Sequence, residues 1–169
     1  VEVASVVRNS STEIVVVAAT AVASEGPVTI RGDSGVTITS TTNWTQLEAS
    51  VIASITPSSG QENSIVRIEG ERLLSGGSSI TGATLVGNAV AGIISSNDSL
   101  IVLRAGPGSE SVGDIVLVAD TGATATFSDS WKYLPAGAIT SVVPGYGQVG
   151  TVVTITGTNL VVANDTISS

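Results

Sequence analysis

The feature that most constrains the fold of this chain is an internal repeat of 87 residues. When the sequence is moved by 87 positions against itself without a gap, about two dozen residues of the overlap are identical. Distinctive residues coincide: Trp44 with Trp131, Leu47 with Leu134, Pro57 with Pro144, Gly60-Gln61 with Gly147-Gln148, Asp33 with Asp120, and Gly35 with Gly122. A regular repeat of this length indicates an array of similar domains.

The repeat predicts three parts of the chain. Residues 1–51 would be the C-terminal half of one repeat, residues 52–138 a complete repeat, and residues 139–169 the N-terminal half of the next. The chain opens in a strand-like segment, Val1 to Val7, without the charged and apolar regions of a signal peptide. We therefore expect a part of a longer protein, with both ends falling inside domains.

The side chains available for a core predict strands. Hydrophobic residues make up 42% of the chain and aromatic residues only 3%, so Val, Ile, Leu and Ala must fill the core. β-branched side chains suit a pleated sheet. In the complete repeat, strands are expected near Ile52–Thr56, Ser64–Glu69, Ala83–Val86, Ala89–Ile94, Leu100–Arg104, Asp114–Ala119 and Ala123–Leu134. Turn residues separate these strands, as in Pro57-Ser58-Ser59-Gly60 and Asp120-Thr121-Gly122. An all-β chain of antiparallel sandwiches follows.

Charge and composition exclude several classes of function. The net charge is −8, and only six Lys and Arg residues are scattered along the chain. Nucleic acids and anionic membranes are therefore not expected as partners, because both require a basic surface. No apolar run is long enough to insert into a membrane. Without His or Cys, no Ser-His-Asp, Cys-His or His-based zinc site can form, and we expect no cofactor, no metal and no enzyme activity.

Two stretches carry a family pattern. In the first, Ile139-Thr140-Ser141-Val142-Val143-Pro144 is followed by Gly147-Gln148 and by a second strand that closes in Gly157-Thr158-Asn159-Leu160. In the complete repeat the same positions read Ile52 to Pro57, Gly60-Gln61 and Ile65 to Leu73. This pattern resembles the IPT/TIG family of immunoglobulin-like domains, which occur in plexins, in some transcription factors and in many cell-surface proteins.

The resemblance implies tandem immunoglobulin-like sandwiches of the E-set type. The chain is also similar to long extracellular repeat arrays of protists, algae or bacteria, including flagellar-hair and adhesive proteins. The expected function is thus a structural repeat protein at the cell surface or outside the cell, forming a stalk, fibre or filament. Its partners would be neighbouring repeats, other copies and surface proteins. The alternative is a spacer in an adhesin or receptor ectodomain whose ligand site lies elsewhere.

Two pairs of carboxylates are candidate chemical sites. Glu69 and Glu71 lie two apart on an expected strand, so they share a face as an acid/base pair would, but a solvated outer face explains them as well. Asp33 and Asp120 recur at one repeat position, which suggests calcium. Each is followed by Ser/Thr-Gly, however, and an Asx-type hairpin turn accounts for both.

An Arg-Gly-Asp tripeptide, Arg31-Gly32-Asp33, is expected at the tip of a hairpin. An adhesion receptor could reach it there. The next repeat carries Val118-Ala119-Asp120 at these positions, so only the turn chemistry is shared and an ordinary hairpin is the competing interpretation.

Four Asn-x-Ser/Thr sequons provide candidate N-glycosylation sites: Asn9, Asn43, Asn97 and Asn164. Three are expected in loops, and strand alternation points Asn43 outward if Trp44 points inward. The alternative is that they are polar turn residues. Trp44 and Trp131 are themselves expected to fill the cores of their sandwiches, in preference to forming a platform that stacks on carbohydrate.

Overall fold

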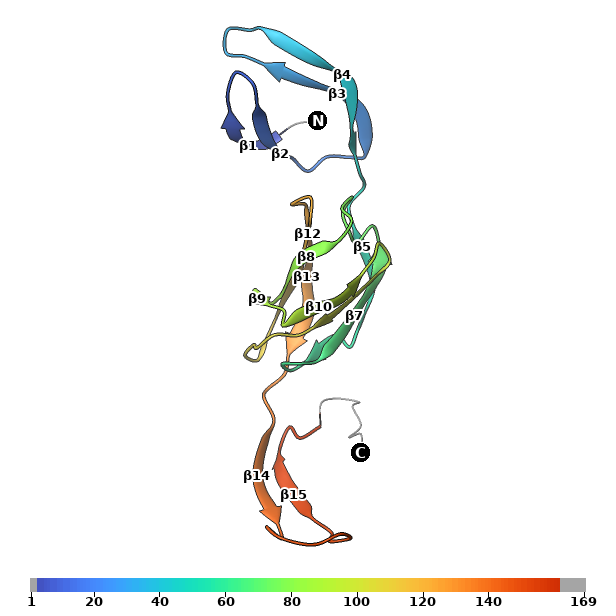
Figure 1. Cartoon of the computed structure of the whole chain (residues 1–169), viewed down its shortest axis with the longest axis vertical. Coiled ribbons are helices and arrows are strands. Elements are labelled where there is room, and N and C mark those ends of the chain that lie inside the picture. The colour runs from blue at the N-terminus through green and yellow to red at the C-terminus, as the bar shows by residue number, and fades with distance from the viewer. Residues whose placement is uncertain (1–2, 162–169) are drawn as a thin grey trace. The chain divides into compact units, whose positions relative to one another are not determined.

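The computed structural model describes residues 3–161 of the chain, and every regular element there is a β-strand (Figure 1). The all-β prediction is confirmed. The chain divides after Ala49 into two compact units.

The first unit consists of two antiparallel hairpins. One pairs β1 (Val3–Asn9) with β2 (Ile14–Ala18), and the other pairs β3 (Ser24–Arg31) with β4 (Thr37–Gln46). Nearly all of their residues remain exposed.

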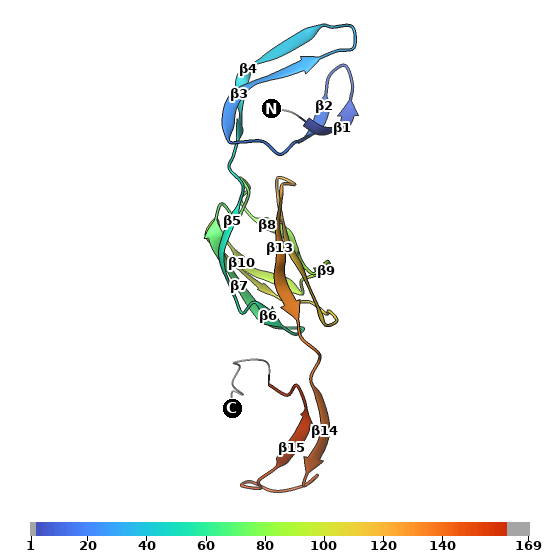
Figure 2. The same cartoon turned by 180° about the vertical axis from the view of Figure 1, so that it is seen from behind.

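The second unit contains a closed sandwich of two sheets, which Figures 1 and 2 show from opposite sides. The strands of the first sheet, in spatial order, are β10 (Gly92–Ser96), β11 (Leu100–Arg104), β7 (Ile65–Glu71) and β5 (Val51–Thr56). Those of the second are β6 (Ser59–Gly60), β13 (Thr124–Tyr133), β12 (Ser111–Ala119), β8 (Ile80–Leu85) and β9 (Asn88–Ala89). A further hairpin, β14 (Ala138–Val143) with β15 (Thr154–Thr158), follows the sandwich.

Alternate side chains of the two sheets meet in one core. On β12, Ile115, Leu117 and Ala119 are buried, as the two-residue period of a strand requires. Trp131 and Tyr133 are the largest buried side chains, and their rings pack edge to face with centroids 5.8 Å apart. Aliphatic residues fill the rest, so the expected Val, Ile, Leu and Ala core is confirmed.

The hairpins outside the sandwich repeat its register at a distance of 87 residues. Gly26 pairs with Trp44 across β3 and β4, just as Gly113 pairs with Trp131 across β12 and β13. The bulge of β14, between Ile139 and Ser141, matches that of β5. Bonding within each hairpin is therefore the same, whether or not a second sheet covers it.

The same glycine is required on β7 of the sandwich and at the equivalent position of β15. A Cβ on Gly70 would collide with the carbonyl oxygen of Val51, and a Cβ on Gly157 with that of Ala138. The close approach of the two strands requires glycine at both places.

Three details differ from the sequence-based expectation. The turn predicted at Pro57–Gly60 contains β6, which pairs in parallel with β13, so the sandwich is not antiparallel throughout. The single strand predicted over Ala89–Ile94 is two strands, because the chain crosses there from β9 in one sheet to β10 in the other. β8 also begins at Ile80, before the predicted Ala83, and β12 begins at Ser111, before the predicted Asp114.

Candidate functional site

The Arg-Gly-Asp tripeptide lies at the tip of the β3–β4 hairpin, as predicted. The Gly32 amide donates to the Val36 carbonyl at 2.8 Å, and the Gly35 amide donates to the Gly32 carbonyl at 2.9 Å. Gly35 has a φ of 85°, which glycine adopts without strain. Arg31 and Asp33 are exposed, and among the described residues neither side chain forms a hydrogen bond or an ion pair. A hydrogen-bonded turn thus presents one cation and one anion to solvent.

The equivalent tip of the sandwich has the same turn but different chemistry. The Gly122 amide donates to the Ala119 carbonyl at 2.9 Å, and Gly122 has a φ of 83°. The Asp120 carboxylate accepts bonds from the Ser78 amide at 3.0 Å and from the Ser78 hydroxyl at 2.5 Å. These bonds hold the pKa of Asp120 below its usual value.

The Asx-type explanation of Asp120 is therefore wrong. Its carboxylate bonds to the loop before β8, 42 residues away, and not to its own turn. Sequence spacing gives no signal for a partner at that separation. No group of three or more acidic residues that could hold a metal ion occurs in the part of the chain that the structure describes.

The carboxylates of Glu69 and Glu71 contact different partners and do not converge on one site. Glu69 accepts a hydrogen bond from the Ser54 hydroxyl at 3.1 Å, whereas Glu71 forms an ion pair with Arg72 at 3.1 Å. Both glutamates are exposed, so the solvated outer face is the better interpretation.

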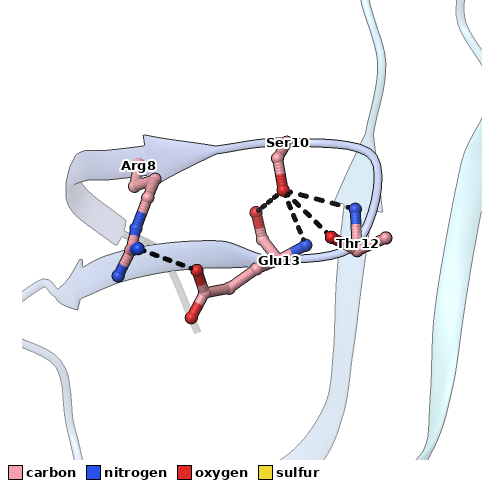
Figure 3. Close-up of polar contacts among 4 residues, drawn as sticks. All are labelled: Arg8, Ser10, Thr12 and Glu13. Carbon is pink, nitrogen blue, oxygen red and sulfur yellow. Dashed lines mark hydrogen bonds and ion pairs between the residues drawn. The ribbon is translucent and has the colours of Figure 1, made fainter.

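Two sequons adjoin matching turns. At the end of β1, Asn9 precedes Ser10, whose hydroxyl oxygen accepts the amides of Thr12 and Glu13 at 3.3 and 3.0 Å, beside an Arg8–Glu13 ion pair (Figure 3). Asn97 holds the position equivalent to Ser10. Its carboxamide oxygen accepts the amides of Ser99 and Leu100 at 2.9 and 2.8 Å, and the Ser99 hydroxyl at 3.0 Å. Both asparagines are exposed.

Asn43 differs in its local bonding. It is exposed on β4, and its side-chain nitrogen donates to Glu25 at 2.9 Å. The fourth sequon, Asn164, lies outside the described residues.

The two tryptophans have different surroundings. Trp131 is 1% exposed and fills the core as predicted, and its indole N–H has no hydrogen-bond partner among the described residues. Trp44 is 47% exposed, because among the described residues its hairpin has no counterpart of the strands β5 and β7 that cover Trp131. The structure therefore does not show the predicted core position for Trp44.

Contacts that the sequence did not suggest hold the segment after β13. The Gln61 side-chain amide donates to the Pro135 carbonyl, and the Asn159 side-chain amide donates to the Ala136 carbonyl at 3.3 Å. The Tyr133 hydroxyl donates to the Gly106 carbonyl at 3.1 Å, and burial raises the pKa of this tyrosine, with a further rise from the charge of Glu62. These groups satisfy backbone carbonyls. Within the described residues, no helix is long and apolar enough to cross a membrane.

Comparison with solved structures gives weak similarities. The full extracellular region of plexin A4 is 16% identical, with a TM-score of 0.49 over 76% of this chain. A mixed-linkage glucan utilisation protein of Bacteroides ovatus, SGBP-B, is 12% identical with a TM-score of 0.43 over 83% of this chain. An auxiliary nutrient binding protein of the same species is 16% identical with a TM-score of 0.42 over 56%. The chain spans only 11%, 38% and 23% of the lengths of these proteins, respectively.

No curated protein matches the chain. The family model of the IPT/TIG domain matches residues 50–133, which cover both sheets of the sandwich. The chain therefore belongs to the IPT/TIG family, through the immunoglobulin-like domain at residues 50–133.

Proposed function

We propose that this chain is a stretch of a non-enzymatic, extracellular structural protein built from tandem IPT/TIG repeats. The observation that carries this proposal is the recurrence of strand register at 87 residues on both sides of the sandwich. Repetition of one module supplies reach and a regular surface. The proposed division is residues 1–51, 52–138 and 139–169, with residues 52–138 as the complete repeat.

The surface chemistry supports a structural role. The exposed glutamates of β7 make only local contacts with Ser54 and Arg72, and the sandwich has no buried polar or charged residue among those described. A net charge of −8 favours solubility of the array. The proposed partners are neighbouring repeats, other copies of the protein, surface proteins and N-linked glycans.

Electron microscopy of the native, full-length protein from its source tests this function. An ordered fibre with a regular axial repeat is expected, with domains of this type recurring along it. Separate flexible strands that end in a distinct head or a membrane anchor would overturn the structural role and leave the chain as a spacer.

Glycosylation is tested by producing the chain in a eukaryotic secretory host and mapping its peptides by mass spectrometry. We expect occupancy at Asn97 and Asn9, whose carboxamide nitrogens form no hydrogen bond in the described structure. Asn43 provides an internal comparison, because its nitrogen is already bonded to Glu25. If Asn9 and Asn97 are both found unmodified, N-linked glycans are no longer among the proposed partners.

A second candidate is a spacer in an adhesin or receptor, and the exposed Arg31-Gly32-Asp33 tip favours it. Cell attachment to surfaces coated with the chain provides the test. If the tip is an adhesion site, Asp33→Glu abolishes attachment, because the longer side chain displaces the carboxylate. Asp120→Glu, at the matching hairpin, provides the control and leaves attachment unchanged. Equal attachment to both variants would exclude the tip.

A further inference from the structure

The outer face of the sheet that contains β7 and β11 carries two arginines. Arg67 on β7 and Arg104 on β11 are both exposed, and neither forms an ion pair among the residues that the structure describes. Arg67 lies opposite Val102, which is two residues before Arg104 on the same strand. Because side chains two apart share a face, both guanidinium groups lie close together on the outside of this sheet.

Aliphatic side chains surround these arginines. Val102 points away from the core that Ile101 and Leu103 enter, yet only 8% of it is exposed. We define the basic face as Ile65, Arg67, Leu100, Val102 and Arg104. Glu69 shares this face, and its carboxylate accepts a hydrogen bond from the Ser54 hydroxyl at 3.1 Å. Arginine beside aliphatic surface is the composition of the centre of a protein interface.

The outer face of the other sheet has the opposite charge. The backbone amide of Asp129 donates to the Asp114 carboxylate at 3.0 Å, so the two acidic residues are neighbours. Neither forms an ion pair within residues 3–161. Valines that alternate with the buried Ile115 and Leu117 lie beside them. We define the acidic face as Val112, Asp114, Val116, Val118 and Asp129.

The two faces are complementary. Lys132 lies opposite Val112 and shares the acidic face. The basic face thus carries two cations and one anion, and the acidic face carries two anions and one cation. Both have an aliphatic surface, on which Ile65 is 41% exposed and Val112 is 56% exposed. They lie on opposite sides of one sandwich, so a single copy cannot bring them together.

We propose that the basic face of one copy of this chain docks on the acidic face of a second copy, sandwich against sandwich. The guanidinium groups of Arg67 and Arg104 then meet the carboxylates of Asp114 and Asp129, and the aliphatic residues pack between them. This inference rests on the proposed function, in which other copies of the protein are partners. Both faces lie entirely within residues 50–133, the matched domain.

The contact is heterologous, because each copy offers one basic and one acidic face. Such a contact repeats from copy to copy and arranges chains side by side. The four charged positions are uncharged in their described equivalents at 87 residues, which are Thr154, Val17, Pro27 and Thr42. The charges therefore distinguish the sandwich from the repeats beside it and would determine which repeats of neighbouring chains meet.

Sedimentation velocity of the whole chain over a wide concentration range provides the first test. We expect association that increases with concentration and decreases with added salt, because salt screens exposed charges. Replacing both arginines, as Arg67→Glu with Arg104→Glu, should weaken association at least about tenfold. Arg31→Glu with Arg8→Glu is the matched control, because it makes the same change of charge outside both faces. Circular dichroism should show the same unfolding temperature of the sandwich for every variant.

A mixture of two variants provides the sharper test. Asp129→Lys reverses a charge of the acidic face and leaves the Asp114 carboxylate in place. Alone, it should associate at least about tenfold more weakly than the parent, as the double arginine variant does. An equimolar mixture of the two should associate again, because the reversed basic face of one variant fits the reversed acidic face of the other.

The outcomes separate this contact from other modes of association. A monomer at every concentration overturns the inference, because the partner of the basic face would not be a second copy. Association that the double arginine variant leaves intact, that salt strengthens, or that the mixture does not restore also overturns it, because another surface would then be responsible. An ordered fibre seen by microscopy together with any of these results would sink only this contact, whereas the absence of a fibre would sink the structural function itself.

Discussion

Trp131 and Trp44 occupy the same place on equivalent strands, yet one is 1% exposed and the other 47%. Each lies opposite a glycine, Gly113 or Gly26, in the same cross-strand register. The difference is the second sheet, which β5 and β7 complete beside Trp131. Pairing within a hairpin is thus a local property of the sequence, whereas burial depends on which other strands are present.

The turns support the same distinction. Asn97 and Ser10 occupy equivalent positions, and both accept backbone amides through a side-chain oxygen. In addition, the backbone amide of Asn97 donates to the Leu100 carbonyl at 2.9 Å, and the backbone amide of Ser10 donates to the Glu13 carbonyl at 2.8 Å. A different residue type thus gives the same turn inside and outside the sandwich.

The largest effect should come from removing the tryptophan that the core surrounds. Trp131→Ala should destabilise the sandwich by about 3–5 kcal/mol, because it leaves a large cavity among fully buried residues. Trp44→Ala is the matched control and should leave the unfolding of residues 50–133 unchanged. Urea unfolding followed by circular dichroism measures both. Equal effects would mean that the two tryptophans do not differ in burial in solution.

A second pair extends the comparison to the other end of the chain. Leu73→Ala removes a fully buried side chain and should cost about 2–5 kcal/mol of the free energy of unfolding. Leu160→Ala removes its half-exposed equivalent and should cost much less. Urea unfolding of both variants provides the measurement. A large loss in Leu160→Ala would show that Leu160 is packed as tightly as Leu73 in solution.

The sequence predicted what is local in this fold. The repeat, the all-β class and the positions of most strands follow from residue spacing and turn chemistry, as at Asp120-Thr121-Gly122. The placement of the Arg31-Gly32-Asp33 tip was also correct, because a hairpin of known register determines its own turn.

What the sequence did not predict depends on contacts between distant segments. β6 forms only because Ser59 and Gly60 pair with Lys132 and Tyr133. Ser78, which bonds to the carboxylate of Asp120, lies in the loop before β8, 42 residues away in the sequence. The exposure of Trp44 likewise depends on strands that are remote in sequence, so alternation along β4 could not determine it.

An effect of intermediate size is expected at Tyr133. Tyr133→Phe removes the hydrogen bond to the Gly106 carbonyl and should cost about 1 kcal/mol. Its folded-state pKa is raised, so the stability linked to this hydroxyl is fully present below the unfolded pKa of about 10 and is lost as pH rises through the folded pKa. Thermal unfolding between neutral and alkaline pH measures this loss, which the variant should show to a smaller extent. Identical alkaline profiles would contradict the role of the hydroxyl.

The smallest effect should distinguish the two hairpin tips. The folded-state pKa of Asp120 is lowered by its bonds to Ser78, so the associated stability is present above the unfolded pKa of about 3.9 and is lost as pH falls through the lower, folded pKa. Ser78→Ala removes the hydroxyl bond and should flatten the acid side of the stability profile. Urea midpoints measured from neutral pH into the acid range provide the comparison. If Ser78→Ala kept the full acid dependence, the bonds to Ser78 that distinguish the Asp120 tip would contribute nothing to stability in solution.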